Sequence, residues 1–105
     1  MNLRMKMLVQ EKQENYDQFG INNNETWQDK FEIFCSLERL SNGEVFLWGR
    51  RKIIATNKII TRYNININNS HRFDYKNRKF EILNTEHDEM NKSFSIFIVR
   101  ELINT

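Results

Sequence analysis

The chain has 105 residues, a formal net charge of +2, a single cysteine and no proline. A chain of this length forms one domain, which we place at residues 1–105, and it leaves no room for a separate catalytic domain. Hydrophobic residues make up 39% of the sequence and aromatic residues 12%, a composition that excludes both a disordered chain and a membrane-spanning one.

The N-terminal third predicts two strands joined by a polar loop. Apolar residues alternate with charged ones over residues 3–9, the pattern of a strand with one buried face. Residues 11–24 are polar and are expected to form a loop. Trp27 then opens a longer strand, in which Cys35 points inward as a small buried thiol in a reducing cytoplasm, while Phe34 points outward.

Residues 41–52 predict a short helix inserted after the second strand. Ser41 is a suitable N-cap, and Glu44 lies three positions later, which is the spacing of a capping box. Residues 50–52 are all basic and would complement the dipole at the C-terminal end of this helix. We expect about three turns at most, because Gly49 weakens a helix interior.

Two alternating strands and a hairpin turn are predicted between residues 56 and 80. The inward face of the first strand is expected to begin at Ile59 and to continue through Tyr63 to Ile67. The second strand points Phe73 inward. Asn77 follows that strand and tolerates positive φ, so a tight hairpin turn is expected there.

The last strand, residues 94–102, is apolar on both faces. We expect Phe94, Ile96 and Ile98 to face the core, which leaves the other face to pack under the helix or against another subunit. The residues expected at a subunit contact are Phe34, Phe46, Trp48, Phe97 and Val99. The sequence thus predicts a mostly-β fold, a small six-stranded antiparallel β-barrel or sandwich with one short α-helix after the second strand.

No grouping of residues predicts a catalytic, metal or cofactor site. His71 and Asp74 lie three positions apart on a strand, so their side chains point to opposite faces. The acidic run at residues 86–89 falls where two strands must be joined, which favours a solvated loop over a metal site. Since zinc-ligand spacing and a phosphate-binding glycine loop are also missing, we do not expect an enzyme.

Charge is unevenly distributed along the chain. Residues 36–80 carry ten basic and three acidic side chains, whereas residues 1–35 and 81–105 are both net acidic. The basic middle suits DNA phosphates, where charge matters and base identity does not. A solvated face with cross-strand salt bridges is the alternative interpretation. The candidate contact residues are Arg50, Arg51, Lys52, Lys58, Arg62, Arg72, Arg78 and Lys79.

Several short motifs occur in a fixed order along the chain. They are Trp27, Leu40–Glu44, Thr56, Ile59, Arg62–Tyr63, Arg72–Phe73, Tyr75, Arg78, Phe80–Ile82 and Arg100–Glu101. This pattern, which extends over residues 3–102, resembles the head-tail adaptor proteins of tailed bacteriophages, also called head-tail joining or head-closure proteins. The chain departs from that pattern at Asn57–Lys58, where such proteins often have His-Arg, and at Asn77, in the hairpin where they have Gly-Gly.

The resemblance implies a small β-barrel that assembles as a homo-oligomeric ring beneath the portal protein and joins the DNA-filled head to the tail. It implies as partners the portal, a tail or stopper protein, further copies of the chain and genomic DNA passing non-specifically, with no cofactor and no membrane. The expected location is the virion neck, after synthesis in the bacterial host cytoplasm.

Within such a ring, residues 41–52 and the basic strand faces would line the DNA channel or the portal contact. Residues 11–24 and 100–105 would become ordered on docking. A small OB-like nucleic-acid-binding module is the alternative function that the sequence leaves open.

Overall fold

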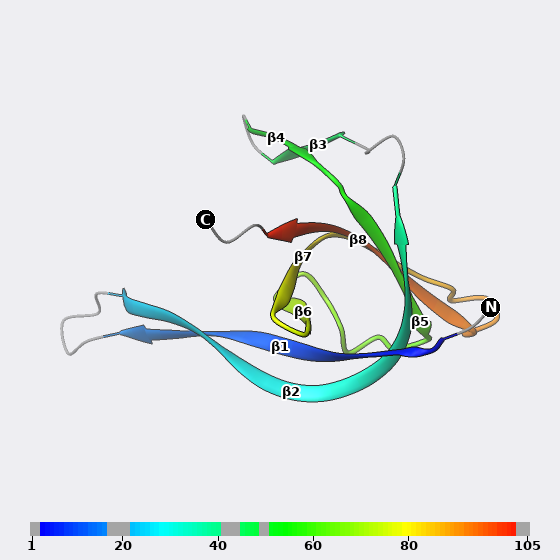
Figure 1. The fold of residues 1–105 in the computed structure, drawn as a ribbon, viewed down its shortest axis with the longest axis horizontal. Helices are drawn as coiled ribbons and strands as arrows, with labels where there is room; N and C mark the ends of the chain where they lie inside the picture. Colours follow the sequence, from blue (N-terminus) through cyan, green and yellow to red (C-terminus); the bar gives the residue numbers. More distant parts are fainter. Residues whose placement is uncertain (1–2, 17–21, 41–44, 49–50, 103–105) are drawn as a thin grey trace.

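The computed structural model describes residues 3–16, 22–40, 45–48 and 51–102, and the side chains of residues 3–13, 26–40 and 54–102. The strands in these ranges are β1 (Met5–Tyr16), β2 (Asn22–Arg39), β3 (Val45–Trp48), β4 (Arg51–Ile54), β5 (Asn57–Arg62), β6 (His71–Tyr75), β7 (Arg78–His87) and β8 (Phe94–Leu102). Six of them close into an antiparallel barrel in the order β1-β2-β5-β8-β7-β6, as Figure 1 shows. This confirms the predicted six-stranded barrel. Within the described ranges no helix is long and apolar enough to span a membrane.

The inside of the barrel is filled by side chains that alternate along its strands. The fully buried residues of this core are Met7, Val9, Cys35, Ile59, Ile67, Phe73, Phe80, Ile82, Phe97 and Val99. The rings of Phe73 and Phe97 meet edge to face with centroids 5.2 Å apart, a geometry that aromatic pairs favour. Each buried Phe, Ile or Val contributes about 1.5–3 kcal/mol relative to an exposed position.

The two faces of β8 are oriented opposite to the prediction. Phe97 and Val99 are fully buried, whereas Phe94 is 37% exposed, so the expectation that Phe97 and Val99 face outward was wrong. The reason lies in register: Phe97 is directly opposite Ile59 of β5, and Val99 is opposite Ile82 of β7. Residues opposite each other in an antiparallel pair share a face, so the two neighbouring strands decide which face of β8 is buried.

The segment after β2 forms a hairpin where a short helix was predicted. β3 pairs with β4 in antiparallel register from Val45 opposite Ile54 to Trp48 opposite Arg51, as a separate two-stranded sheet. The sequence of this hairpin is rich in Val, Phe, Trp and Ile, residue types that favour strands. The proposed helix cap at residues 41–44 lies outside the described residues.

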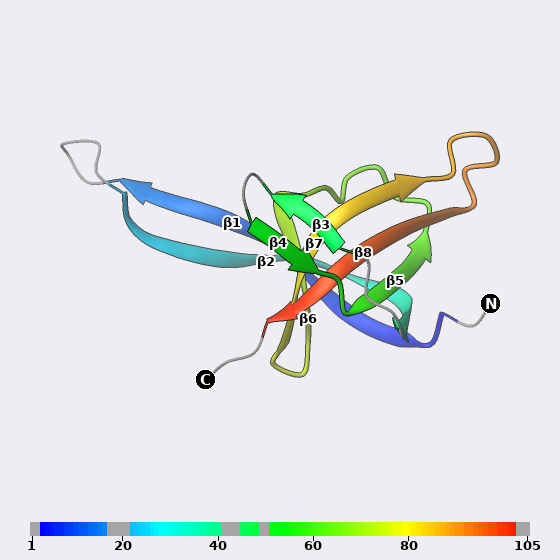
Figure 2. The same ribbon diagram turned by 90° about the horizontal axis from the view of Figure 1, so that it is seen from above.

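The polar stretch at residues 11–24, predicted as a loop, belongs largely to two long strands. β1 and β2 stay paired as far as Tyr16 opposite Asn22, whereas pairing of β1 with β6 stops at Glu11. The outer parts of both strands therefore leave the barrel as a two-stranded arm, seen at the left of Figures 1 and 2. Hydrophobic alternation did not reveal this arm, because no barrel core covers either of its faces.

The connection between β5 and β6 also differs from the prediction. β5 ends at Arg62, and Ile65 is 61% exposed, while Ile67 is buried. The side-chain oxygen of Asn64 accepts a hydrogen bond from the Asn66 amide at 2.9 Å. Such local hydrogen bonds turn the chain and compete with strand pairing, which explains why the alternating pattern is not a strand here.

The tight turn predicted between β6 and β7 is confirmed. Lys76 and Asn77 have φ values of 49° and 68°. Two consecutive residues with positive φ are what a type I′ two-residue hairpin turn requires, and asparagine tolerates that conformation better than most residues. This turn sets the register of Tyr75 opposite Arg78.

Candidate assembly surface

Arg72, one of the predicted contact residues, is held within the fold. Its Nε donates a hydrogen bond to Oε1 of Gln10 at 2.7 Å, and its guanidinium carbon lies 4.2 Å from the centroid of the Trp27 ring. Gln10 in turn donates from its own amide to Asp29 at 2.7 Å. Burial lowers the pKa of Arg72, although nearby carboxylates oppose that shift. Arg72 therefore fastens β6 to the base of the arm.

Three further predicted contact residues form cross-strand ion pairs. Arg78 makes two hydrogen bonds to the Glu101 carboxylate, at 2.8 and 2.9 Å. This pairing raises the pKa of Arg78 and lowers that of Glu101. Lys58 lies 3.4 Å from the carboxylate of Glu38, and Lys79 pairs with Asp74. Cross-strand salt bridges, the alternative to DNA contact, thus account for the positions of these three basic side chains.

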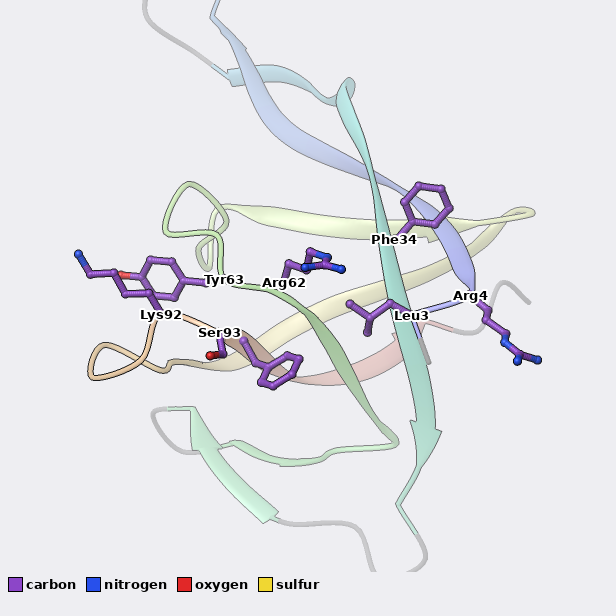
Figure 3. A pocket seen from close by; sticks show the side chains of 8 residues that line it. Leu3, Arg4, Phe34, Arg62, Tyr63, Lys92 and Ser93 are labelled. Atoms are coloured by element: carbon purple, nitrogen blue, oxygen red, sulfur yellow. The ribbon is translucent and has the colours of Figure 1, made fainter. Parts of the chain in front are cut away.

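Arg62 differs from this group. It is exposed at the end of β5, and no described residue forms a hydrogen bond or ion pair with its guanidinium. It lines an open hollow of about 870 Å³, shown in Figure 3, at the end of the barrel opposite the arm. We call this feature the basic-aromatic hollow; its lining residues are Leu3, Arg4, Phe34, Arg62, Tyr63, Lys92, Ser93 and Phe94.

The lining of the basic-aromatic hollow combines positive charge with exposed aromatic rings. Arg4, Arg62 and Lys92 contribute three cations, and the described residues of the lining include no carboxylate, although Glu89 lies beside the Tyr63 hydroxyl. Phe34 is 57% exposed and Phe94 37% exposed. A surface of this kind attracts a negatively charged partner and gains further free energy when that partner covers the rings.

Tyr63 joins the hollow to the turn between β7 and β8. Its hydroxyl donates a hydrogen bond to Oε2 of Glu89 at 2.8 Å, and this bond raises the pKa of Tyr63. The Tyr63 ring also meets the His87 ring edge to face, with centroids 5.8 Å apart. His87 Nδ1 lies 2.6 Å from the Ser95 hydroxyl. These contacts fix the turn that carries Lys92.

Sequence reasoning found only part of this surface. It placed Arg62 and Phe34 on the outside, but it assigned Tyr63 and Phe94 to the core and gave Arg4 and Lys92 no role. Barrel closure places Arg4, before β1, and Lys92, before β8, on opposite sides of one hollow (Figure 3), and no local spacing in the sequence signals that they share it. The backbones of Phe46, Trp48, Arg51 and Lys52 lie on the β3–β4 hairpin, but their side chains and Arg50 fall outside the described residues.

Titratable groups elsewhere serve the fold. Cys35 is buried in the barrel core, and burial raises the pKa of its thiol to about 11. Such a thiol is protonated and unreactive at neutral pH. Among the residues that the structure describes, no three His, Cys, Asp or Glu side chains are grouped so that they could hold a metal ion.

The sequence model of the phage head completion protein family matches residues 1–102. The chain belongs to the phage head completion protein family. This head completion protein is therefore a structural protein of the phage virion, located in the head region, whose partners are other virion proteins. A search of curated proteins finds no match to the sequence.

Two solved structures resemble the head completion protein in fold. A chain from the virion of a native gene transfer agent particle aligns with a TM-score of 0.71 and 19% identity, over 99% of each chain. Protein SF1141 from Shigella flexneri 2a aligns with a TM-score of 0.71 and 21% identity, over 98% of this chain and 96% of that one. At these identities the likeness establishes the barrel and nothing further.

Proposed function

We propose that this head completion protein is a connector, which assembles as a ring beneath the portal and joins the DNA-filled head to the tail. Membership of the head completion family is the observation that carries the proposal. The location that follows is the virion neck, with the portal on one side of the ring and a tail or stopper protein on the other.

The shape of the subunit supports assembly through side chains. Within the closed barrel each strand is paired on both sides, so copies cannot associate by adding a strand to that part of the sheet; open strand edges occur on the arm and on the β3–β4 hairpin. The arm extends from one end of the molecule, and the end of β5 and the start of β8, which carry Arg62 and Phe94 of the hollow, lie at the other end (Figures 1 and 2). Contacts between two different surfaces of identical subunits form a ring when the rotation between neighbours closes.

The β3–β4 hairpin is the part of the subunit that we assign to the DNA channel or the portal contact. Its backbone stands apart from the barrel in Figure 1, and its sequence includes the basic residues Arg51 and Lys52. DNA passage needs only non-specific attraction to phosphates, which a few basic side chains in each subunit of a ring supply. The paired residues Lys58, Arg72, Arg78 and Lys79 are not part of this assignment.

Deleting the gene for this protein from its phage genome tests the proposal. We expect DNA-filled heads and free tails to accumulate separately, and we expect added purified protein to join them. Electron microscopy of the lysate counts joined particles. Normal numbers of tailed particles without the protein would show that it does not join heads to tails.

The alternative, an OB-like nucleic-acid-binding module, makes a different prediction for the same purified protein. It predicts salt-dependent binding of single-stranded or duplex DNA by the isolated chain. A connector binds DNA weakly until copies are assembled around the channel, because each subunit contributes few unpaired cations. Fluorescence anisotropy with labelled DNA at low and high salt distinguishes the two functions.

A further inference from the structure

We propose that the basic-aromatic hollow of one subunit receives the tip of the β1–β2 arm of a neighbouring copy. The inference rests on the proposed ring and names the two surfaces that would hold it together. The tip is residues 14–25, which comprise the ends of β1 and β2 and the segment between them.

The hollow needs an acidic and partly apolar occupant. Arg4, Arg62 and Lys92 have no hydrogen-bond or ion-pair partner for their side chains in the part of the chain that the structure describes. The three cations are spread along the hollow (Figure 3), and a negatively charged partner that extends along it would pair with them. The exposed rings of Phe34 and Phe94 beside these cations favour an occupant that also carries apolar side chains.

The tip has the composition that the hollow requires. Residues 14–25 include three carboxylates, on Glu14, Asp17 and Glu25, and no basic residue. The same twelve-residue stretch contains Tyr16, Phe19 and Ile21. Acidic and apolar groups thus occur together in one short segment, as they would in a partner for the hollow.

The positions of the two surfaces make the contact intermolecular. The arm extends from one end of the barrel, and the hollow lies at the other end, beside the N-terminus and the β7–β8 turn (Figures 1 to 3). β-pairing between the two arm strands and the Arg72–Trp27 stack fix the direction of the arm. A subunit therefore cannot place its own tip in its own hollow, and the contact joins copies head to tail.

DNA is the competing occupant for a surface with cations and aromatic rings. Duplex phosphates would satisfy Arg4, Arg62 and Lys92 but would leave the Phe34 and Phe94 rings in water. A protein segment with apolar side chains covers both kinds of group. The exposed rings therefore favour the arm of another copy.

Disulfide trapping tests the contact directly in assembled particles. In a Phe19→Cys, Ser93→Cys double variant, one cysteine lies in the tip and the other in the hollow. Mild oxidation is expected to give a ladder of covalently linked multimers on a non-reducing gel, while each single variant gives none. Cys35 does not interfere, because its thiol is buried. A Phe19→Cys, Ile54→Cys variant is the matched control, since Ile54 is exposed on the β3–β4 hairpin.

Charge reversal provides a second test that does not depend on cysteine geometry. Arg62→Glu is expected to lower the yield of completed particles at least about tenfold, because like charges across an interface are strongly unfavourable. Combining it with Asp17→Lys is expected to restore most of that loss. Lys76→Glu, an equal charge change at an exposed turn outside the hollow, is expected to have no effect.

The outcomes separate this inference from the proposed connector function. Tailed particles that contain the double-cysteine variant only as monomer would overturn the arm contact and leave the connector function intact. An Arg62→Glu defect that Asp17→Lys does not rescue, together with weakened binding of the purified variant to duplex DNA, would assign the hollow to DNA and overturn the arm contact. Tailed particles without the protein would overturn the connector function itself.

Discussion

The guanidinium of Arg72 stacks over the Trp27 ring at 4.2 Å and so ties β6 to the point where the β1–β2 arm leaves the barrel. Pairing between β1 and β6 ends next to this contact, at Glu11 opposite His71. Beyond that register position β1 continues to pair with β2, and the Lys12 amide donates a hydrogen bond of 3.4 Å to the Ser70 carbonyl, just before β6. The stack therefore supports the arm at the point where it leaves the barrel.

Replacing Arg72 by Ala is expected to lower the free energy of unfolding by about 1–3 kcal/mol, because the variant loses the stack on Trp27 and leaves Gln10 short of a hydrogen-bond donor. Urea denaturation measures the change. The double variant with Trp27→Ala is expected to show a coupling energy of about 1 kcal/mol. The matched control is Arg62→Ala, for which a change within about 0.5 kcal/mol is expected.

Phe97→Ala is expected to cost about 3–5 kcal/mol, because the side chain is fully buried and packs against Phe73. Phe34→Ala, which removes the same atoms from an exposed position, is expected to change stability by less than about 0.5 kcal/mol. Thermal and urea unfolding of the two variants give the comparison. Similar costs for both would contradict the orientation of β8.

The Arg78–Glu101 pair predicts a pH dependence of stability. Since Arg78 lowers the pKa of Glu101 below its ordinary value of 4.5, the folded state binds this proton less readily than the unfolded state. The stabilisation is therefore complete above pH 4.5 and is lost as the pH falls through the lowered pKa. Both side chains are partly exposed, so we expect only about 0.3–1 kcal/mol.

Unfolding of the wild type and of Arg78→Gln over this pH range measures the effect of the pair. The stability difference between the two proteins should be constant near neutral pH and should shrink in acid. It should also shrink at high salt, because ions screen exposed pairs. A difference that grows in acid would contradict the direction of the pKa shift.

Deleting the β3–β4 hairpin is expected to leave a folded barrel that cannot complete heads. β3 and β4 pair only with each other, and the Leu40 amide donates a hydrogen bond to the Thr56 carbonyl at 3.0 Å. A short glycine linker can therefore replace residues 41–54. Circular dichroism and cooperative unfolding check the fold, and the yield of infectious particles checks the function. Full infectivity would contradict the role assigned to the hairpin.

The barrel was predictable because most of its strands have one apolar face. Met7, Val9, Cys35 and Phe73 were all expected inside and are buried. β8 was not predictable in the same way, because both faces are apolar and only its register with Ile59 and Ile82 selects the buried one.

The β5–β6 connection, the arm and the hollow could not be predicted from the alternation of apolar and polar residues, because each depends on other interactions. Asn64 has the right spacing for a strand, but its side chain turns the backbone instead. The outer parts of β1 and β2 extend beyond their pairing with the barrel, so no barrel core requires apolar residues to alternate along them. Arg4 and Lys92, almost ninety positions apart, come to line the same hollow when the barrel closes.

Val9 in the core and Tyr16 near the end of the arm belong to one uninterrupted strand. A pull on the arm is consequently carried along a covalent backbone into the buried interior, without passing through a hinge between separate elements. Such a load enters the barrel at Glu11, where the pairing of β1 with β6 begins. Mechanical resistance of this subunit thus depends on the same apolar packing that sets its thermal stability.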